Sequence, residues 1–187
     1  MKTIYLWVVE KGWIPFDFEA EETKALLKEK NIQIGNGAKI GYGVRIGYGA
    51  KIGDGAEIGD WAEIGDWAEI GYGAEIGDGA EIGDGAKIGN RAKIGYGAKI
   101  GNRVRIGYGA KIGDRAEIIK SIFITGSRHT INWYGTGIIH IGCHKKEISW
   151  WLENYKVIGE KEGYSETEIQ EYYQYIKICD ELQKTIK

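Results

Sequence analysis

A six-residue unit repeats without interruption from Ile34 to Glu117, and it constrains the fold more than any other feature. Each of the fourteen units begins with Ile and Gly, has Ala or Val at position five, and ends in Lys, Arg or Glu. The fifth residue of one unit and the first of the next are two apart, so they face the same side of an extended strand. Glycines at positions two and often four allow backbone angles that other residues avoid, so the chain can turn there. Each unit therefore predicts a short strand followed by a corner.

A strand this short cannot bury its Ile alone, so successive units must stack to form a continuous core of Ile and Ala. This predicts an all-β solenoid of parallel strands. The units resemble those of the hexapeptide-repeat family of left-handed parallel β-helices, in which three units form one triangular coil. The resemblance covers the fourteen units and implies a left-handed helix of about 4.7 coils and assembly as a homotrimer.

The segments on either side of the repeats predict three further parts. Residues 1–33 contain a strand over 3–9 and a short helix over about 19–30, which we expect to cap the first coil. The solenoid is predicted over 34–123, a β-rich closing segment over 124–146, and a two-helix appendage over 147–187. A capping box formed by Ser165 and Glu168 predicts the start of the second helix. Cys179 lies on the apolar stripe of that helix and is predicted to be a buried structural thiol.

Charge is segregated along the chain although the net charge is only −2. Residues 34–86 carry a net charge of −7 and residues 87–146 carry +10. A concentrated positive field attracts anions, and arginine suits phosphate through paired hydrogen bonds. The alternative without a function is that these basic residues form a solvated surface that balances the acidic residues of 34–86. Like charges eighteen residues apart repel when they are stacked, as for Lys93 with Lys111 and Glu57 with Glu75, so we expect these ladders to find partners outside their own face.

Candidate site residues follow from this charge and from nearby aromatic residues. Trp133 and Tyr134 could stack on a nucleobase or simply cap the core, whereas Trp61 and Trp67 replace corner residues and are predicted to lie in an oligomer interface. The candidate ligand-binding residues are Arg103, Arg105, Lys111, Arg115, Ser127, Arg128, His129, Trp133 and Tyr134.

The hexapeptide-repeat family includes acyltransferases in which a histidine acts as general base. Here the repeats contain no histidine, and this departure argues against catalysis. His129 is the one plausible base, because His140 alternates with Ile139 and Ile141 along a predicted strand. His140, Cys143 and His144 lack a second pair of ligands at zinc spacing, so no metal site is expected.

Three functional hypotheses follow. The first is a non-catalytic homotrimer, without a cofactor, that binds a small anion such as a cyclic nucleotide or an ADP-ribose-type molecule. The tail resembles those of small repeat proteins encoded by bacteriophages and prophages, which suggests sequestration of a nucleotide immune signal in the host cytoplasm. The alternative is a CoA-dependent acyltransferase that uses acetyl-CoA, with His129 as base, and the third hypothesis is a purely structural trimer.

Location and other partners are constrained by composition. The chain has no run of about 20 apolar residues and no signal-peptide pattern, so no membrane partner is expected. Two cysteines do not make a disulfide framework, which predicts a reduced, cytoplasmic protein. Double-stranded nucleic acid is not an expected partner.

Overall fold

The structure, a computed structural model, describes residues 2–186 and contains two compact units. The first ends at Ile119 and the second begins at Lys120. Each unit is described by itself.

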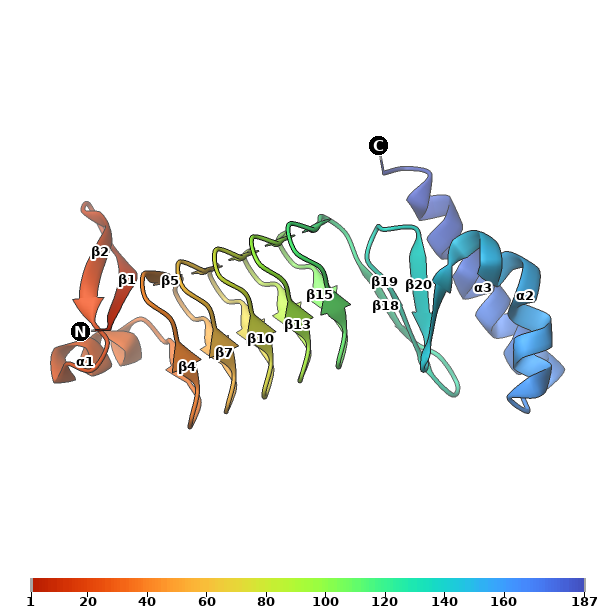
Figure 1. The fold of residues 1–187 in the computed structure, drawn as a ribbon, viewed down its shortest axis with the longest axis horizontal. Coiled ribbons are helices and arrows are strands. Elements are labelled where there is room, and N and C mark those ends of the chain that lie inside the picture. Colours follow the sequence, from red (N-terminus) through yellow and green to blue (C-terminus); the bar gives the residue numbers. More distant parts are fainter. Residues whose placement is uncertain (1, 187) are drawn as a thin grey trace. The chain divides into compact units, whose positions relative to one another are not determined.

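The first unit begins with two strands and a helix, β1 (Thr3–Val8), β2 (Gly12–Asp17) and α1 (Glu21–Glu29). Fifteen short strands follow, and Figure 1 shows β4, β7, β10 and β13 stacked in parallel. These strands are β3 (Gln33–Ile34), β4 (Lys39–Ile40), β5 (Val44–Ile46), β6 (Lys51–Ile52), β7 (Glu57–Ile58), β8 (Glu63–Ile64), β9 (Glu69–Ile70), β10 (Glu75–Ile76), β11 (Glu81–Ile82), β12 (Lys87–Ile88), β13 (Lys93–Ile94), β14 (Lys99–Ile100), β15 (Arg105–Ile106), β16 (Lys111–Ile112) and β17 (Glu117–Ile118).

Three sheets form the sides of the solenoid, and all their strands pair in parallel except β2, which pairs antiparallel with β1. We call them the β3 sheet (β15-β12-β9-β6-β3), the β4 sheet (β16-β13-β10-β7-β4) and the seven-stranded sheet (β17-β14-β11-β8-β5-β1-β2). Residues eighteen apart are paired, as Ile58 is with Ile40 and Ile76. The prediction of a left-handed parallel β-helix with three hexapeptides per coil is confirmed.

Isoleucine and alanine fill the interior of the solenoid as predicted. The first-position isoleucines from Ile40 to Ile118 are at most 9% exposed. The fifth-position residues from Val44 to Ala110 are also buried. Backbone hydrogen bonds join adjacent coils, such as that from Lys39 N to Ala56 O at 2.8 Å. The coils are therefore held together by stacked apolar side chains and by backbone pairing.

The two glycine positions of the repeat have different physical causes. At the second position there is no room for a side chain, because a Cβ on Gly41 would lie 2.6 Å from the backbone nitrogen of Asp60. At the fourth position the backbone is left-handed, as at Gly55 with φ +63°. Only the fourth position therefore needs glycine for its backbone angles, whereas the sequence predicted this for both positions.

Five units place a large residue at the left-handed corner instead of glycine. These residues have φ between +55° and +60°, and they are Trp61, Trp67, Arg91, Arg103 and Arg115. The tryptophan rings lie over the glycine one coil earlier, so a Cβ on Gly43 would lie 2.4 Å from Trp61 Cε3. The arginine Cγ atoms lie less close to the equivalent glycines, at 3.5 to 3.8 Å from where a Cβ would be.

Aspartate and asparagine at the third position hold the corners in place. The Asp60 Oδ1 atom accepts a hydrogen bond from Tyr42 N at 2.7 Å, and Asp66 Oδ1 accepts one from Tyr48 N at 2.8 Å. The same contact recurs between Asp114 and Tyr96 N. These side chains satisfy backbone donors at the turns, a role that the sequence analysis did not identify.

The charged ladders pair within their own faces, which corrects the sequence prediction. Lys93 does stack against Lys111, but its Nζ atom lies 2.6 Å from a carboxylate oxygen of Glu75 on the opposite side. Similar pairs join Lys39 to Glu57, Arg45 to Glu63, Lys87 to Glu69 and Lys99 to Glu81. A neighbouring subunit is therefore not needed to neutralise these charges.

The N-terminal segment extends the seven-stranded sheet at the first coil. Strand β1 pairs in parallel with β5, and this places Ile4 and Leu6 in the buried core. Strand β2 pairs antiparallel with β1 and was not predicted. The helix α1 begins at Glu21 and ends at Glu29, within the predicted range.

The second unit packs two helices on an antiparallel sheet. Its strands are β18 (Ile122–Thr125), β19 (Thr130–Trp133), β20 (Ile138–Ile141) and β21 (His144–Glu147), and its helices are α2 (Ile148–Lys161) and α3 (Glu166–Gln183). The β-rich segment therefore forms a separate sheet with β18 and does not continue the sheets of the solenoid. Ile122 and Ile124 pack against the buried core of this unit, which explains why the solenoid ends before residue 123. None of the described helices has the length and apolar character needed to cross a membrane.

We predict that Gly43→Ala destabilises the first unit more than Gly37→Ala does. Both glycines are left-handed, at φ +72° and +68°, so both variants incur a cost of about 1–2 kcal/mol. A Cβ on Gly43 would meet the Trp61 ring, whereas a Cβ on Gly37 would have nothing within 4 Å. Chemical denaturation monitored by circular dichroism measures both values. In a Trp61→Gly background the excess cost should disappear, and an excess that persists there would contradict the assignment.

Candidate functional site

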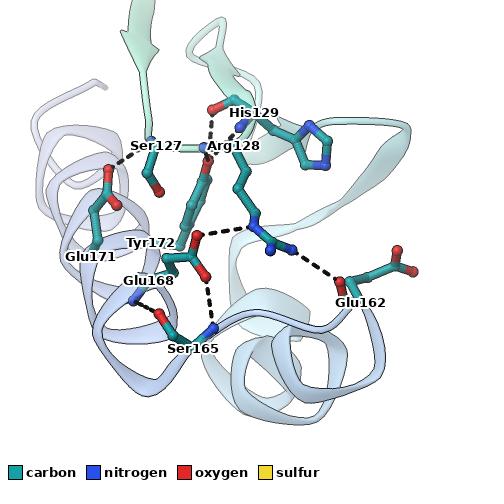
Figure 2. Close-up of polar contacts among 8 residues, drawn as sticks. All are labelled: Ser127, Arg128, His129, Glu162, Ser165, Glu168, Glu171 and Tyr172. Atoms are coloured by element: carbon teal, nitrogen blue, oxygen red, sulfur yellow. Dashed lines mark hydrogen bonds and ion pairs between the residues drawn. The ribbon is translucent and has the colours of Figure 1, made fainter.

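The hairpin between β18 and β19 is held on α3 by one tyrosine hydroxyl. Tyr172 Oη accepts hydrogen bonds from Arg128 N at 3.0 Å and His129 N at 2.5 Å, and it donates one to His129 O at 2.9 Å. Ser127 N donates to Glu171 Oε1 at 2.9 Å. Figure 2 shows these contacts converging on α3. The Gly126–His129 segment is therefore fixed by backbone hydrogen bonds to one helix.

The Arg128 side chain takes part in the same contact. Its Nε atom donates to Glu168 Oε1 at 2.9 Å, and Nη1 donates to the Glu162 carbonyl at 3.3 Å. The guanidinium lies 4.9 Å from the centre of the Tyr164 ring. Because its donors contact carboxylate and carbonyl oxygens of the protein, Arg128 joins the hairpin to the helices.

Glu168 connects this arginine to the start of α3. It completes the predicted capping box, accepting from Ser165 N at 2.7 Å while Glu168 N donates to Ser165 Oγ at 3.3 Å. The hydrogen bond from the Ser165 backbone, reinforced by Arg128, holds the pKa of Glu168 below its ordinary value. A lowered carboxylate pKa stabilises the fold above the ordinary pKa, and that contribution is lost as the pH falls through the lowered value.

Several predicted ligand residues are enclosed in the protein. Trp133 is 1% exposed, and its indole nitrogen donates to Gln183 Oε1 at 3.1 Å. Tyr134 is also buried. Neither ring therefore presents a face on which a nucleobase could stack, which corrects that interpretation. Trp133 belongs to the interior because alternate residues of β19 face the buried core, whereas Tyr134 follows β19 and packs against His140.

The remaining predicted ligand residues lie in the first unit. Arg105 and Lys111 begin strands β15 and β16, and Arg103 and Arg115 occupy left-handed corners. The Arg115 guanidinium lies 5.7 Å from the centre of the Tyr96 ring. The predicted basic site is thus divided between two units, and its role in binding stays a prediction.

The second unit contains an apolar cavity of about 50 Å³ beside the docked hairpin. Its walls come from β20, β21, both helices and the turns between them. The lining residues are His129, Ile141, Cys143, His144, Trp151, Tyr155, Ile158, Gly159, Glu162, Tyr164, Ile169, Tyr172 and Ile176. Two of the three histidines of the chain therefore line one cavity.

The position of His129 is set by close packing on both sides. A Cβ on Gly142 would lie in tight contact with the ring, 3.0 Å from His129 Cδ2, and the left-handed φ of +57° at this position also favours glycine. The Tyr164 ring lies 6.1 Å away, centre to centre. Burial raises the pKa of Tyr164 to about 12, so its phenol stays neutral and can donate a hydrogen bond at physiological pH.

The second imidazole is paired with a carboxylate. His144 Nε2 lies 3.5 Å from Glu162 Oε1, and its ring contacts the edge of Trp151. The sequence analysis did not identify His144 or Glu162 as neighbours of His129. The signal for His144 was the alternation of β21, which places it opposite Ile141 on the helix-facing side of the sheet.

His140 lies outside this cavity. It is half-buried against Tyr134, and burial, with the nearby Lys145, lowers its pKa. Ile139 and Ile141 are buried on the other face, as predicted. Cys179 is fully buried, and burial raises its pKa to about 12, in agreement with a structural thiol. Within residues 2–186, no group of three histidine, cysteine or acidic side chains is arranged to hold a metal ion.

The two corner tryptophans are about half exposed, Trp61 by 56% and Trp67 by 52%. Each ring contacts the edge of a tyrosine one coil earlier, Trp61 with Tyr42 at 5.1 Å and Trp67 with Tyr48 at 5.3 Å between centres. Their place in an oligomer interface stays a prediction.

Comparison with known proteins finds a family model that matches part of the repeat region. Residues 31–66 and 79–114 match the model described as "Bacterial transferase hexapeptide (six repeats)". The solenoid is thus built from hexapeptide repeats of this kind. A search of curated proteins finds no match to the chain.

Solved structures resemble part of this chain at low identity. The acetyltransferase domain of PglB from Neisseria gonorrhoeae is 23% identical, with 48% of this chain and 47% of that chain covered, and a TM-score of 0.41. A GDP-perosamine N-acetyltransferase variant from Caulobacter crescentus, in complex with CoA and GDP-perosamine, is 21% identical, with 52% and 55% covered and a TM-score of 0.28. The chain therefore spans about half the length of these structures.

We predict that Tyr172→Phe destabilises the second unit by about 2 kcal/mol, because it leaves the backbone donors of Arg128 and His129 without their partner. Urea unfolding monitored by tryptophan fluorescence measures the change. Tyr173→Phe is the control, since the Tyr173 ring stacks on Tyr155 and should keep that contact without its hydroxyl. Equal stability of the two variants would contradict the role assigned to the Tyr172 hydroxyl.

Proposed function

We propose that the chain is a homotrimeric, CoA-dependent acyltransferase in which His129 is the general base. The observation that carries the proposal is the placement of His129 and His144 around one apolar cavity, in a chain whose repeats contain no histidine. The match of the repeats to a bacterial transferase model supports the reaction class, and hexapeptide-repeat proteins are commonly trimers.

The cavity suits a short acyl group. Its lining is mostly apolar, and a volume of about 50 Å³ corresponds to a few heavy atoms when one water requires about 10–15 Å³. Acetyl and propionyl groups fall in this range, whereas a long fatty chain does not. Acetyl-CoA, a substrate in this scheme, would deliver the acyl group as a thioester.

The chemistry assigned to the residues is a balanced acyl transfer. An acceptor amine or hydroxyl attacks the thioester carbonyl, and neutral His129 takes the proton from the attacking group. The acyl–sulfur bond breaks and CoA leaves as a thiolate, which receives a proton from the imidazolium. The Tyr164 ring lies 6.1 Å from the imidazole between centres, and burial raises the pKa of its phenol to about 12.

We expect His129→Ala to lower the release of free CoA thiol from short acyl-CoA at least about 100-fold, the usual contribution of a general base. A panel of amine and alcohol acceptors supplies the second substrate, and a thiol reagent measures the rate. His140→Ala is the matched control, because His140 lies outside the cavity and should retain full activity. Equal background rates for wild type and His129→Ala would contradict the proposal.

Binding without turnover is a second candidate, favoured by the net charge of +10 over residues 87–146. The partner would be a small anion, such as a cyclic nucleotide or an ADP-ribose-type molecule, and sequestration would be the function. Ion pairs within the chain reduce the positive charge that is available to bind an anion; they involve Lys87, Lys93, Lys99 and Arg128. Calorimetry with a nucleotide panel tests it, and saturable heat without acyl transfer would favour this candidate over the enzyme.

A further inference from the structure

The four tryptophans of the first unit gather around one face of the solenoid. Trp7 and Trp13 are paired across β1 and β2, which extend the seven-stranded sheet, and their rings meet edge to face at 5.7 Å between centres. Trp61 and Trp67 occupy the corners immediately before and after β8 of the same sheet. The corner between the β3 and β4 sheets has no tryptophan. This asymmetry is not imposed by the repeat, whose units are equivalent on all three faces.

The fold itself does not need these exposed rings. Trp7 is 52% exposed, which is close to the exposure of Trp61 and Trp67. At the two corners tryptophan adopts left-handed angles that glycine adopts at lower cost, as glycine does in nine other units. Large, exposed aromatic side chains grouped on one surface are typical of contact sites between proteins.

Four of the five outward charged residues on this face are paired with one another along the chain. Arg45 pairs with Glu63, and its guanidinium also lies 5.8 Å from the Trp13 ring centre. Lys99 pairs with Glu81 at 2.9 Å. A saccharide site would instead offer open hydrogen-bonding groups between its aromatic rings. Paired charges flanked by aromatic side chains fit contact with a protein partner better.

We infer that the seven-stranded face is the surface through which one copy of the chain binds another, and that the second copy presents its β3-sheet face. The two faces carry opposite net charge. The seven-stranded face has a net charge of −1, from Arg45, Lys99, Glu63, Glu81 and Glu117. The outward residues of the β3 sheet have a net charge of +2, from Lys51, Lys87, Arg105 and Glu69.

The dimensions and symmetry agree with this contact. Seven strands spaced about 4.8 Å apart make a face roughly 29 Å long, which is long enough for a standard protein interface. A contact between two different faces is heterologous, and a rotation of one third of a turn closes it into a ring of three. The inference rests on the self-association in the proposed function and names the face that performs it, independently of the acyl-transfer chemistry.

The test is sedimentation velocity of the full chain across a concentration series. We expect the wild type to sediment with three times the chain mass of 20.8 kDa. The double variant Trp61→Gly/Trp67→Gly should dissociate with a dissociation constant raised at least about 100-fold, because buried tryptophans commonly dominate interfaces. Both changes restore the usual residue of the repeat at a left-handed corner, so circular dichroism should show an intact solenoid.

Arg91→Gly is the matched control, because Arg91 is also a left-handed corner residue above a glycine but lies between the β3 and β4 sheets. It should leave the dissociation constant within about twofold. Lys51→Glu, on the opposing face, should weaken association because it reverses a charge. A monomeric wild type, or a double variant that associates as well as wild type, would overturn the inference. An acyltransferase assay on the same samples reports separately on the proposed function.

Discussion

Pairing of each residue with the one eighteen positions later is the constraint on which the solenoid depends. It places isoleucine on isoleucine in the core and joins the backbone of each coil to the next. The close approach of the coils explains the second-position glycines, since a Cβ on Gly41 would meet the next backbone. It also explains the aspartates and asparagines that bind corner amides of the preceding coil. Most positions of the repeat are therefore committed to the fold.

Because most repeat positions are needed for the fold, different surfaces of the molecule have different roles. Ion pairs between coils join most of the outward charged residues, and such exposed pairs contribute little to stability. The left-handed corners are the places where the repeat varies in size, and their tryptophans all flank one face. Histidine is confined to the second unit, where His129 and His144 line an apolar cavity. Recognition between copies and acyl chemistry are accordingly assigned to different units.

The sequence predicted the solenoid well because its signal is local and repeated fourteen times. The inward isoleucines, the capping box at Ser165 and the buried Cys179 followed from spacing alone. The contacts of Ser127 and Arg128 could not be predicted from spacing, because their partners Glu171 and Glu168 lie 44 and 40 residues away on α3. The prediction for the stacked charges was wrong because only one of the two stacked neighbours of each charged residue was considered. Lys93 has a lysine on one side and a glutamate on the other.

The second unit was harder to predict because it has no repeat. Its strands are joined by hairpins whose register depends on packing against two helices, and the cavity exists only once all six elements are assembled. His144 and Glu162 are separated by the whole of α2, so no short motif marks their contact. The boundary near residue 120 depends on Ile122 and Ile124 packing into this second core, which a local pattern of β-forming residues does not specify.

A crystal structure of the full chain with a short acyl-CoA tests the central claim most directly, namely that the solenoid is a scaffold and the second unit holds the chemistry. The account predicts that the acyl group lies in the cavity between His129 and His144, with its carbonyl carbon within reach of an acceptor that His129 can deprotonate. An acyl group bound along the coils, with the cavity of the second unit empty, would contradict the account.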